Sequence, residues 1–462
     1  MPPLGATSSL FPSEVGANTE QEVLVGISDL HLGAFNSTWS FFIDQDDPQL
    51  RRVFSRDPPE YNLLHSHSAW DLCQRVLNSI DAEVADLAAG RPVGARTLVL
   101  IGDILDLSLG PTALAFLNAR CLFHFLHESK KFSKIVYVPG NHDHHVWRMV
   151  VEADMLQKAV AGGSAKYERC SIAARPALAL AQMLDVKTPL TVAYPHYLHP
   201  LSGPNFGSAR PWQIVFHHGH LLERWWTLLS DALASPSGKM HSIEELEAIN
   251  EPLTELLWFS VGDAGRLSDM TSALYTGSSD ARGLRRKVDD ILEGAASELS
   301  ARSGVARPWW LPLWLVRAVV PRLVGRLSAP RSRPERMVAA ASTLRGDALG
   351  GELLRAVTSY RSRYAPVTPS CFIFGHTHRT QSTVQSTDTK HGIDLEAASI
   401  VSATHPQGFD THILNTGGWV VEPRGKPPDA SIFIAVGEQL RLVSVDIPDS
   451  AIQVAQAGIG LR

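Results

Sequence analysis

The chain has 462 residues, of which 44% are hydrophobic and 19% charged, with a formal net charge of −5 and a pI near 6.4. This composition excludes a disordered or fibrous protein, and the length predicts either two domains or one large core with an insertion. The acidic balance creates no global positive field, so nucleic acid is not expected as a partner.

Residues 1–21 lack the basic start and the continuous apolar segment of a secretory signal, and we expect a flexible N-terminus there. The four cysteines lie far apart in the sequence, which predicts reduced thiols rather than a disulfide framework or a zinc ribbon. Both features favour a cytoplasmic location.

Short apolar segments rich in β-branched residues recur along the chain and are bounded by Gly, Pro, Asn or Asp, as buried strands are. These segments are 22–28, 97–101, 134–138, 213–217, 371–375 and 431–436. Helical periodicity over 70–89 and 112–127 separates the first three of them. The alternation predicts an α/β fold with a largely parallel or mixed sheet, and the strand-rich pattern after Trp419 predicts antiparallel pairing there.

From Leu221 to about Tyr364 the strand pattern disappears and helical patterns replace it, so we expect a helical insertion there. Within it, Ser242 and Glu245 have the spacing of a capping box. The insertion separates two His-rich strand ends, so its own ends should lie close to the site that those motifs build. The expected divisions are a flexible N-terminus at 1–21, a core of 22–220 and 366–446, the helical insertion or cap at 221–365, and a C-terminal tail at 447–462.

The most apolar part of the insertion is Pro308–Leu327, which contains three arginines and two prolines. A spanning helix would have to bury these charges and tolerate two breaks, so we do not expect it to cross a membrane. The insertion also contains tryptophans, and its arginines lie among aliphatic residues. Such a composition suits either of two roles for this segment. The segment 305–327 either packs the cap on the core or makes peripheral contact with the inner membrane face.

Five short motifs of metal-binding residue types each follow a predicted strand. They are Asp29-x-His31, Gly-Asp103-x-x-Asp106, Gly-Asn141-His142-Asp143, the histidines 217, 218 and 220 around Gly219, and Gly-His376-x-His378. Because sites form at the carboxyl ends of strands in α/β sheets, the five motifs predict one shared site. The nitrogen and oxygen ligands, without thiolate, favour Mn, Fe, Zn or Ni over Ca, and manganese is our first expectation.

This ordered set of motifs resembles the calcineurin-like metallophosphoesterase family over residues 22–220 and about 366–446, but not over the insertion. The resemblance implies a four-layer αββα sandwich with two central mixed sheets. It also implies two divalent metal ions, with Asp103 as the bridging ligand. One ion would be held by Asp29, His31, Asp103 and His378, and the other by Asp103, Asn141, His218 and His376.

By the same resemblance, His142 protonates the leaving oxygen, Asp106 orients the His142 ring, and a hydroxide bridging the ions attacks phosphorus. The ligand among the three clustered histidines is the one directly before Gly219, which selects His218, although the sequence alone leaves His217 and His220 open. Also left open are His144, His145, Arg148 and Arg379, which either contact substrate phosphate or belong to solvated helix starts.

The substrate class follows from finer comparison within the family. Asp106-Leu107-Ser108 and Asp143 replace the Asp-Arg-Gly and Gly-Asn-His-Glu of protein phosphatases, which argues against a phosphoprotein. His-Gly-His, Gly-His-Thr-His-Arg and residues 415–419 (Asn-Thr-Gly-Gly-Trp) look more like bacterial UDP-2,3-diacylglucosamine hydrolases, although the third motif and His220 depart from them.

We therefore expect hydrolysis of a phosphoester or pyrophosphate in a small-molecule, nucleotide-linked or lipid-linked substrate. The alternatives are a nuclease or cyclic-nucleotide phosphodiesterase, and a non-catalytic scaffold with the same fold. Acidic net charge and the lack of a long basic tract count against a nuclease, and the filled ligand positions count against a scaffold.

Overall fold

The computed structural model describes the chain in separate ranges, and all statements below concern these residues. They are 20–44, 63–65, 67–108, 112–162, 171–201, 212–222, 370–376, 378, 380–382, 393–394, 411–421, 427–437 and 439–459, with the single positions 247, 250, 251, 255, 259, 357 and 360.

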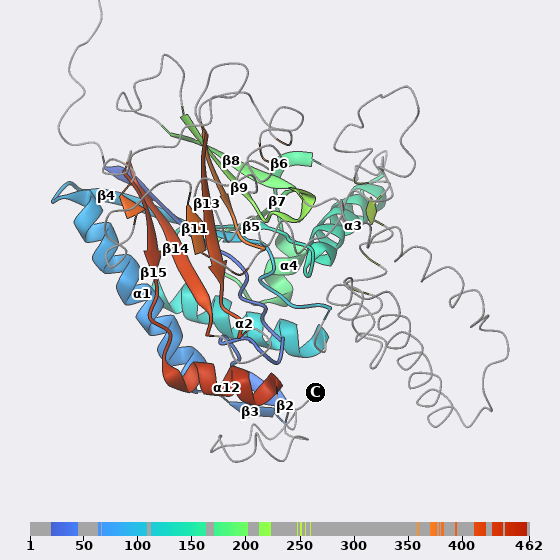
Figure 1. The fold of residues 1–462 in the computed structure, drawn as a ribbon. Coiled ribbons are helices and arrows are strands. Elements are labelled where there is room, and N and C mark those ends of the chain that lie inside the picture. The colour runs from blue at the N-terminus through green and yellow to red at the C-terminus, as the bar shows by residue number, and fades with distance from the viewer. Residues whose placement is uncertain are drawn as a thin grey trace, which may run out of the picture.

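Figure 1 shows a mixed α/β fold built around one large sheet.

The helices are α1 (His67–Ala88), α2 (Thr112–Ser129), α3 (His144–Val160), α4 (Leu178–Met183) and α12 (Asp449–Ile459), with a 3-10 turn, η2, at His220–Leu222. The first strands are β1 (Gln21–Ile27), β2 (Phe42–Asp44), β3 (Leu63–His65), β4 (Val93–Ile101), β5 (Lys134–Val138), β6 (Ser171–Pro176), β7 (Leu190–Tyr194), β8 (His196–Leu201) and β9 (Trp212–His217). The later strands are β10 (Ser370–Phe374), β11 (Thr380–Ser382), β12 (Ile393–Asp394), β13 (Thr411–Gly418), β14 (Asp429–Val436) and β15 (Gln439–Ser444).

The main sheet has thirteen strands in the order β6-β7-β5-β4-β1-β14-β13-β10-β9-β8, with β11 paired to β13, β15 to β14 and β12 to β15. Strands β1, β4, β5 and β7 pair in parallel, as do β9, β10 and β13. The C-terminal pairs β13–β14 and β14–β15 are antiparallel, as the pattern after Trp419 predicted. A large mixed sheet is thus confirmed, but its two halves are joined through the short β13–β14 pairing instead of forming separate sheets.

All six predicted strands and both predicted helices are present, with ends shifted by a few residues. A helix start at His144 was one of two interpretations left open, and α3 begins there. The helices α4 and α12 and most of the other strands were not predicted from the sequence. The segment 447–462, expected to be a tail, contains α12, which contacts α1. Its residues Ala451, Val454 and Ala455 are buried, so the C-terminal helix is part of the packed core.

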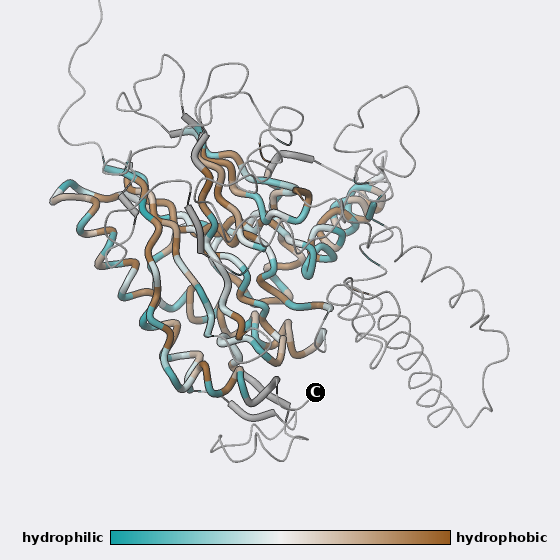
Figure 2. Tube along the Cα trace, in the orientation of Figure 1, coloured by the Kyte–Doolittle hydropathy of each residue, from teal (hydrophilic) through white to brown (hydrophobic). Residues whose placement is uncertain are grey.

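Alternation along the central strands assigns their side chains to two apolar layers. In β1, Val23 and Val25 join the cluster that contains the apolar faces of α1 and α2, whereas Leu24 joins a second cluster. The second cluster combines β1, β4 and β5 with Phe216 of β9 and Ile373 of β10. The two halves of the sheet therefore bury one face against each other. Brown, apolar residues run along several of the strands in Figure 2.

The expected insertion leaves the sheet beside the predicted site. It follows β9 through η2, and Leu222 is buried. Tyr360, near its other end, donates to or accepts from His196 Nδ1 over 2.8 Å and packs its ring edge-on against His217 at 4.5 Å. The chain then re-enters the sheet at Ser370, which pairs with Gln213 at the opposite end of β9.

Several sequence predictions lie outside the described residues: the N-terminus to residue 19, most of the helical insertion including the capping box and 305–327, and Arg379.

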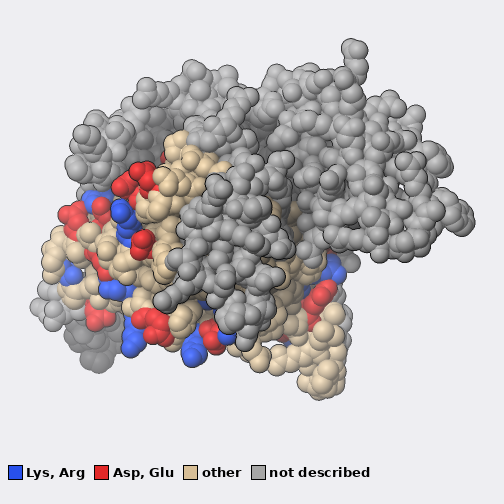
Figure 3. Space-filling view, turned by 90° about the horizontal axis from the view of Figure 1, so that it is seen from below, with Lys and Arg blue, Asp and Glu red and all other residues tan. Residues whose placement is uncertain are grey.

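The three cysteines that the structure describes are free thiols. None of the helices within the described ranges is long and apolar enough to cross a membrane. On the face in Figure 3, acidic and basic side chains are interspersed over the described surface.

Candidate metal centre

The predicted ligands converge because their strands are neighbours with the same direction. Asp29 and His31 follow β1, Asp103 follows the adjacent β4, and Asn141 follows β5. The backbone N–H of His31 donates to the Asp103 carbonyl over 2.9 Å, which holds the first two of these loops side by side. From the other half of the sheet, the Gly375 N–H donates to the His218 carbonyl over 3.0 Å and aligns the ends of β9 and β10.

Most of these ligand residues have an unusual backbone conformation. Left-handed φ angles occur at only eight described residues other than glycine. Five of the eight are predicted ligands: Asp29 (52°), His31 (49°), Asp103 (49°), His376 (70°) and His378 (53°). Such conformations persist where surrounding structure enforces them and concentrate at functional sites, so they support this site independently of any sequence motif.

One group of potential ligands consists of Asp29, His31 and His378. The Nε2 atoms of the two histidines are 3.0 Å apart, and His378 Nε2 is 3.5 Å from Asp29 Oδ1. The other ring nitrogen of His31, Nδ1, donates to Asp106 Oδ2 over 2.9 Å. That bond leaves Nε2 of a neutral ring with a lone pair directed into the group. At metal sites, a carboxylate bonded to the far nitrogen of a ligating histidine fixes the ring in the same way.

A second group consists of Asp103, His218 and His376, with Asn141 beside it. His218 Nδ1 donates to the Ile101 carbonyl over 3.2 Å, so Nε2 of the neutral ring carries a lone pair. This Nε2 is 3.1 Å from Asp103 Oδ2, 3.1 Å from Asn141 Oδ1 and 3.2 Å from His376 Nδ1. The lone pairs of His218 Nε2, Asp103 Oδ2 and Asn141 Oδ1 thus face one another, an arrangement that a cation stabilises.

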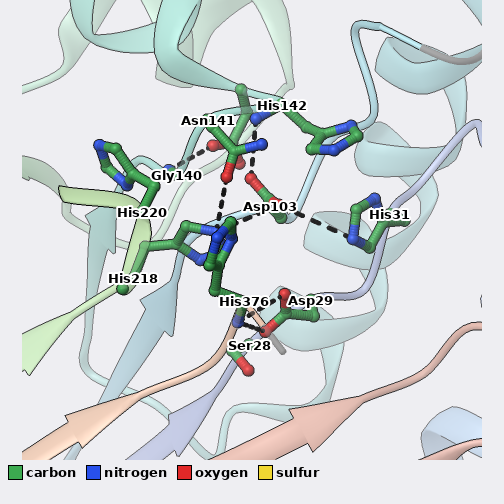
Figure 4. A network of polar contacts seen from close by, with 12 residues as sticks. Ser28, Asp29, His31, Asp103, Gly140, Asn141, His142, His218, His220 and His376 are labelled. Atoms are coloured by element: carbon green, nitrogen blue, oxygen red, sulfur yellow. Dashed lines mark hydrogen bonds and ion pairs between the residues drawn. The ribbon is translucent and has the colours of Figure 1, made fainter. Parts of the chain in front are cut away.

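Asp103 lies between the two groups, as Figure 4 shows. Its Oδ2 is 3.1 Å from His218 Nε2 and 3.8 Å from His31 Nε2, whereas its Oδ1 accepts the backbone N–H of His142 over 2.8 Å. The same carboxylate therefore faces both groups and is fixed by a backbone donor. This position is the one that a ligand shared between two ions requires.

Burial of the carboxylates has an electrostatic cost. Desolvation and the neighbouring Asp103 charge raise the pKa of Asp29 well above 3.8. Burial also disfavours ionised Asp103, but the nearby His218 and His142 outweigh it and hold its pKa well below 3.8. For His378, desolvation and then His31 lower the pKa well below 6.5, which favours the neutral, ligating form. A divalent ion would relieve the repulsion between the two carboxylates.

His142 forms a third group of potential ligands with His31 and Asp106, and it is treated separately because the resemblance gives it the role of an acid. Its side chain is 12% exposed, more than the buried carboxylates beside it, and its Nδ1 lies 3.3 Å from Asp106 Oδ2 and 2.5 Å from Ser108 Oγ. Burial lowers the pKa of His142, but Asp106 and then Asp103 outweigh this effect and raise it from 6.5 to about 9. A protonated, partly accessible imidazole beside the ligand groups can act as a general acid.

Asp143 has a structural role that sequence reasoning missed. Its carboxylate accepts the Gly140 N–H at 2.6 Å, the Ile104 N–H at 2.7 Å and the Tyr137 hydroxyl at 2.5 Å. It therefore ties the loop after β4 to the loop after β5. The signal was present in the sequence, because a carboxylate three residues after a turn glycine often accepts that glycine's N–H.

Position 375 requires glycine because the Ser28 and Asp29 side chains lie against its backbone. A Cβ there would lie 1.9 Å from Asp29 Oδ2 and 2.4 Å from Ser28 Oγ. Any side chain would displace the carboxylate that bonds the His376 N–H at 2.9 and 3.0 Å. Thr416, from the segment 415–419, contacts Ser28 beside this glycine. Thr416 Oγ1 is 2.6 Å from Ser28 Oγ and donates to the Phe374 carbonyl over 3.2 Å.

Of the three clustered histidines, the structure brings only His218 into a ligand group. His217 Nδ1 instead accepts the Gly219 N–H over 2.8 Å. His220 Nε2 is 3.3 Å from the Tyr194 hydroxyl, and desolvation followed by the neighbouring His218 lowers its pKa well below 6.5. The choice of His218 from its place before Gly219 agrees with this geometry.

The residues just after the third motif face carboxylates. His144 lies between Glu247 at 2.5 Å and Glu255 at 2.7 Å, and His145 Nδ1 is 2.7 Å from Glu255. Arg148 pairs with Glu251 and Glu152. We call Glu247, Glu251 and Glu255, spaced four residues apart, the carboxylate ladder. Two interpretations were left open for His144, His145 and Arg148. Their pairing with glutamates argues against contact with substrate phosphate.

A scan against protein-family models finds no match to this chain, and a search of curated proteins finds no significant match. The evidence for the site is therefore its own geometry. Nitrogen and oxygen atoms in two adjacent groups, with the Asp103 carboxylate facing both, fit borderline divalent cations such as manganese, iron or zinc.

Proposed function

We propose that this chain is a two-metal-dependent phosphoesterase of the calcineurin-like type. The observation that carries the proposal is the close approach of three lone-pair atoms, His218 Nε2, Asp103 Oδ2 and Asn141 Oδ1. Beside them lies a second group, whose His31 Nε2 is 3.8 Å from the same Asp103 oxygen. Phosphoester chemistry is proposed because the order of motifs resembles this family. The four-layer sandwich is part of the same proposal, and the two apolar layers on either side of β1 support it.

The ligands would be divided as the resemblance implies: Asp29, His31, Asp103 and His378 for one ion, and Asp103, Asn141, His218 and His376 for the other. Bound there, divalent cations supply Lewis-acid activation of water and of the phosphoryl group. The chain's own residues do the rest. His31 and His218 are kept in the ligating tautomer by Asp106 and the Ile101 carbonyl, and His142 holds the proton that the leaving oxygen needs.

The substrate we propose is a small phosphoester or pyrophosphate, including nucleotide-linked and lipid-linked phosphates. Support comes from the motif similarity to bacterial UDP-2,3-diacylglucosamine hydrolases and from the departures from protein phosphatases. A cytoplasmic location, with peripheral contact at the inner membrane face through 305–327, belongs to the same proposal. Flotation with anionic liposomes tests that contact, and failure to float would remove it.

The test of the function compares wild type, Asp103→Asn and the surface control Asp71→Asn in the presence of Mn²⁺. Bound metal is measured together with hydrolysis of bis-p-nitrophenyl phosphate, p-nitrophenyl phosphate and a panel of UDP-sugars. We expect two ions and activity in wild type and the control, and loss of both in Asp103→Asn. The preferred ester then identifies a diesterase, monoesterase or pyrophosphatase.

A wild-type protein that binds two ions but hydrolyses none of these esters would contradict the phosphoesterase proposal and favour the scaffold alternative. A protein that binds no divalent metal would contradict the whole assignment of the site.

A further inference from the structure

Ser108 makes the nearer of two contacts that the loop after β4 offers to His142. Its Oγ is 2.5 Å from His142 Nδ1, whereas Asp106 Oδ2 is 3.3 Å from the same nitrogen. Ser108 is completely buried, so bulk water does not compete for its hydroxyl. Its backbone N–H also donates to Asp106 Oδ1 over 3.0 Å, which fixes the residue against the carboxylate.

The hydrogen atoms of this group can be assigned. The Ser108 hydroxyl donates to Asp106 Oδ1 over 3.1 Å, because an ionised carboxylate only accepts. The hydroxyl oxygen is then free to accept the Nδ1–H of His142. The other oxygen of Asp106, Oδ2, accepts from His31 Nδ1 over 2.9 Å. One carboxylate thus orients His31 directly and His142 mainly through a serine.

We propose that Ser108 is a positioning residue that holds the proton of His142 on Nδ1 and directs Nε2 toward the leaving oxygen of the substrate. This inference rests on the proposed function. In the acid step, the Nε2–H bond breaks, its electron pair stays on the ring, and the proton forms an O–H bond with the leaving oxygen. The imidazole becomes neutral and keeps its Nδ1–H, which the Ser108 hydroxyl oxygen accepts.

The kinetic test uses Ser108→Ala and the matched control Ser40→Ala. Ser40 is also buried, and its hydroxyl donates to the Ser37 carbonyl over 3.0 Å, away from His142. Two phosphodiesters are compared, one losing p-nitrophenolate and the other the more basic phenolate. Because a basic leaving group depends most on the acid, Ser108→Ala should lower kcat for the phenyl ester about 10–100-fold. The p-nitrophenyl ester should change less than about threefold, with metal content unchanged.

A second measurement needs no activity. Long-range ¹H–¹⁵N spectra of the metal-free, histidine-labelled protein, recorded at a pH high enough for a neutral His142 ring, report which ring nitrogen carries the remaining proton. The signals are assigned by their loss in His142→Gln. We expect the Nδ1–H form in wild type and Ser40→Ala, and a mixture of tautomers in Ser108→Ala.

The two measurements separate the possible failures. An inactive wild type contradicts the proposed function, while the spectra still decide on Ser108. If Ser108→Ala keeps the wild-type tautomer and slows both esters equally, the positioning role is wrong.

Discussion

The left-handed backbone at five ligand residues has an energetic meaning. For an L-residue with a Cβ, this region costs about 1–2 kcal/mol relative to the right-handed one. This cost falls on residues such as His376 and His378, which are separated by one residue and contribute to the two ligand groups. The site is therefore preorganised at the expense of folding stability, which a glycine at the same position would partly recover.

The pair of substitutions His378→Gly and His378→Ala tests this strain. Both remove the ligand, but glycine adopts the φ of +53° without strain, so His378→Gly should be about 1 kcal/mol more stable than His378→Ala. Urea unfolding of the metal-free proteins measures the difference. At the helical, exposed His124 the order should be reversed by about 1 kcal/mol, because glycine disfavours helices. The same order at both positions would rule out backbone strain at His378.

Removing the side chain of the proposed acid and removing that of a proposed ligand should have different effects on metal content and kcat. His142→Ala is expected to lower kcat by about 10²–10⁴-fold, the usual contribution of a general acid, with two ions still bound. His31→Ala should instead lose metal, because His31 Nε2 points into a ligand group. Metal analysis and steady-state kinetics on the same samples distinguish the two. A fully active His142→Ala protein would refute the acid assignment.

Among the elements, the carboxylate ladder connects α3 to the segment around residues 247–259. His144 is its central contact and is also packed edge-on against Tyr194 of β7 at 5.3 Å. His145 stacks on Phe259 at 3.6 Å, so apolar and charged contacts act at the same place. Because α3 begins directly after Asp143, the ladder fixes the helix that supports the loop of Asn141 and His142.

The ladder predicts a pH window of stability. Burial lowers the pKa of His144, but Glu247 and Glu255 raise it from 6.5 to about 10. Burial raises the pKa of Glu255, but His144 and His145 lower it from 4.5 to about 2. The histidine contribution is complete below pH 6.5 and is lost toward pH 10, whereas the glutamate contribution is complete above pH 4.5 and is lost toward pH 2.

The stability difference between wild type and the double variant Glu247→Gln/Glu255→Gln should therefore be largest between pH 4.5 and 6.5 and should narrow on either side. Thermal unfolding across this pH range measures it. Glu152→Gln serves as the control, because its pair with Arg148 is an i,i+4 surface pair with a small and nearly constant contribution. A difference that is constant with pH would contradict the charged state assigned to His144.

The sequence predicted the elements whose signal is local. β5 at Lys134–Val138 is apolar and bounded by turn residues, and its ligand Asn141 follows at once. β8 was missed because Pro200 and two histidines hide its strand character, whereas β15 was missed although Leu440 and Leu442 alternate with polar residues.

Contacts between distant segments left no such signal. Glu255 meets His144 across 111 positions, and nothing near either residue indicates the pairing. Ser108 was noted only as a departure from a family motif, since its contact with His142 depends on how two loops meet. The residues of the candidate site were predictable because each motif places side chains of ligand type at short spacings directly after a strand.

For the whole molecule, metal binding should stabilise the fold because the ligands come from both halves of the sheet. At a free ion concentration 100 times the dissociation constant, one site contributes about 2.7 kcal/mol to the free energy of unfolding. EDTA should lower the unfolding temperature and Mn²⁺ should restore it in wild type, but neither should act on Asp103→Asn. Calorimetry checks this, and an equal response of the variant would place the stabilising ion elsewhere.

The pairing of β1 with β14 joins Val23 to Val436 across nearly the whole chain. On a ribosome that adds roughly 5–20 residues per second, β1 waits about 20–80 s for this partner. During synthesis the apolar edge of β1 is exposed to other nascent chains, and His376 and His378 emerge long after the other ligands. The proposed set of ligands is therefore complete only late in translation, and the yield of the protein in cells should depend on chaperones that cover that edge.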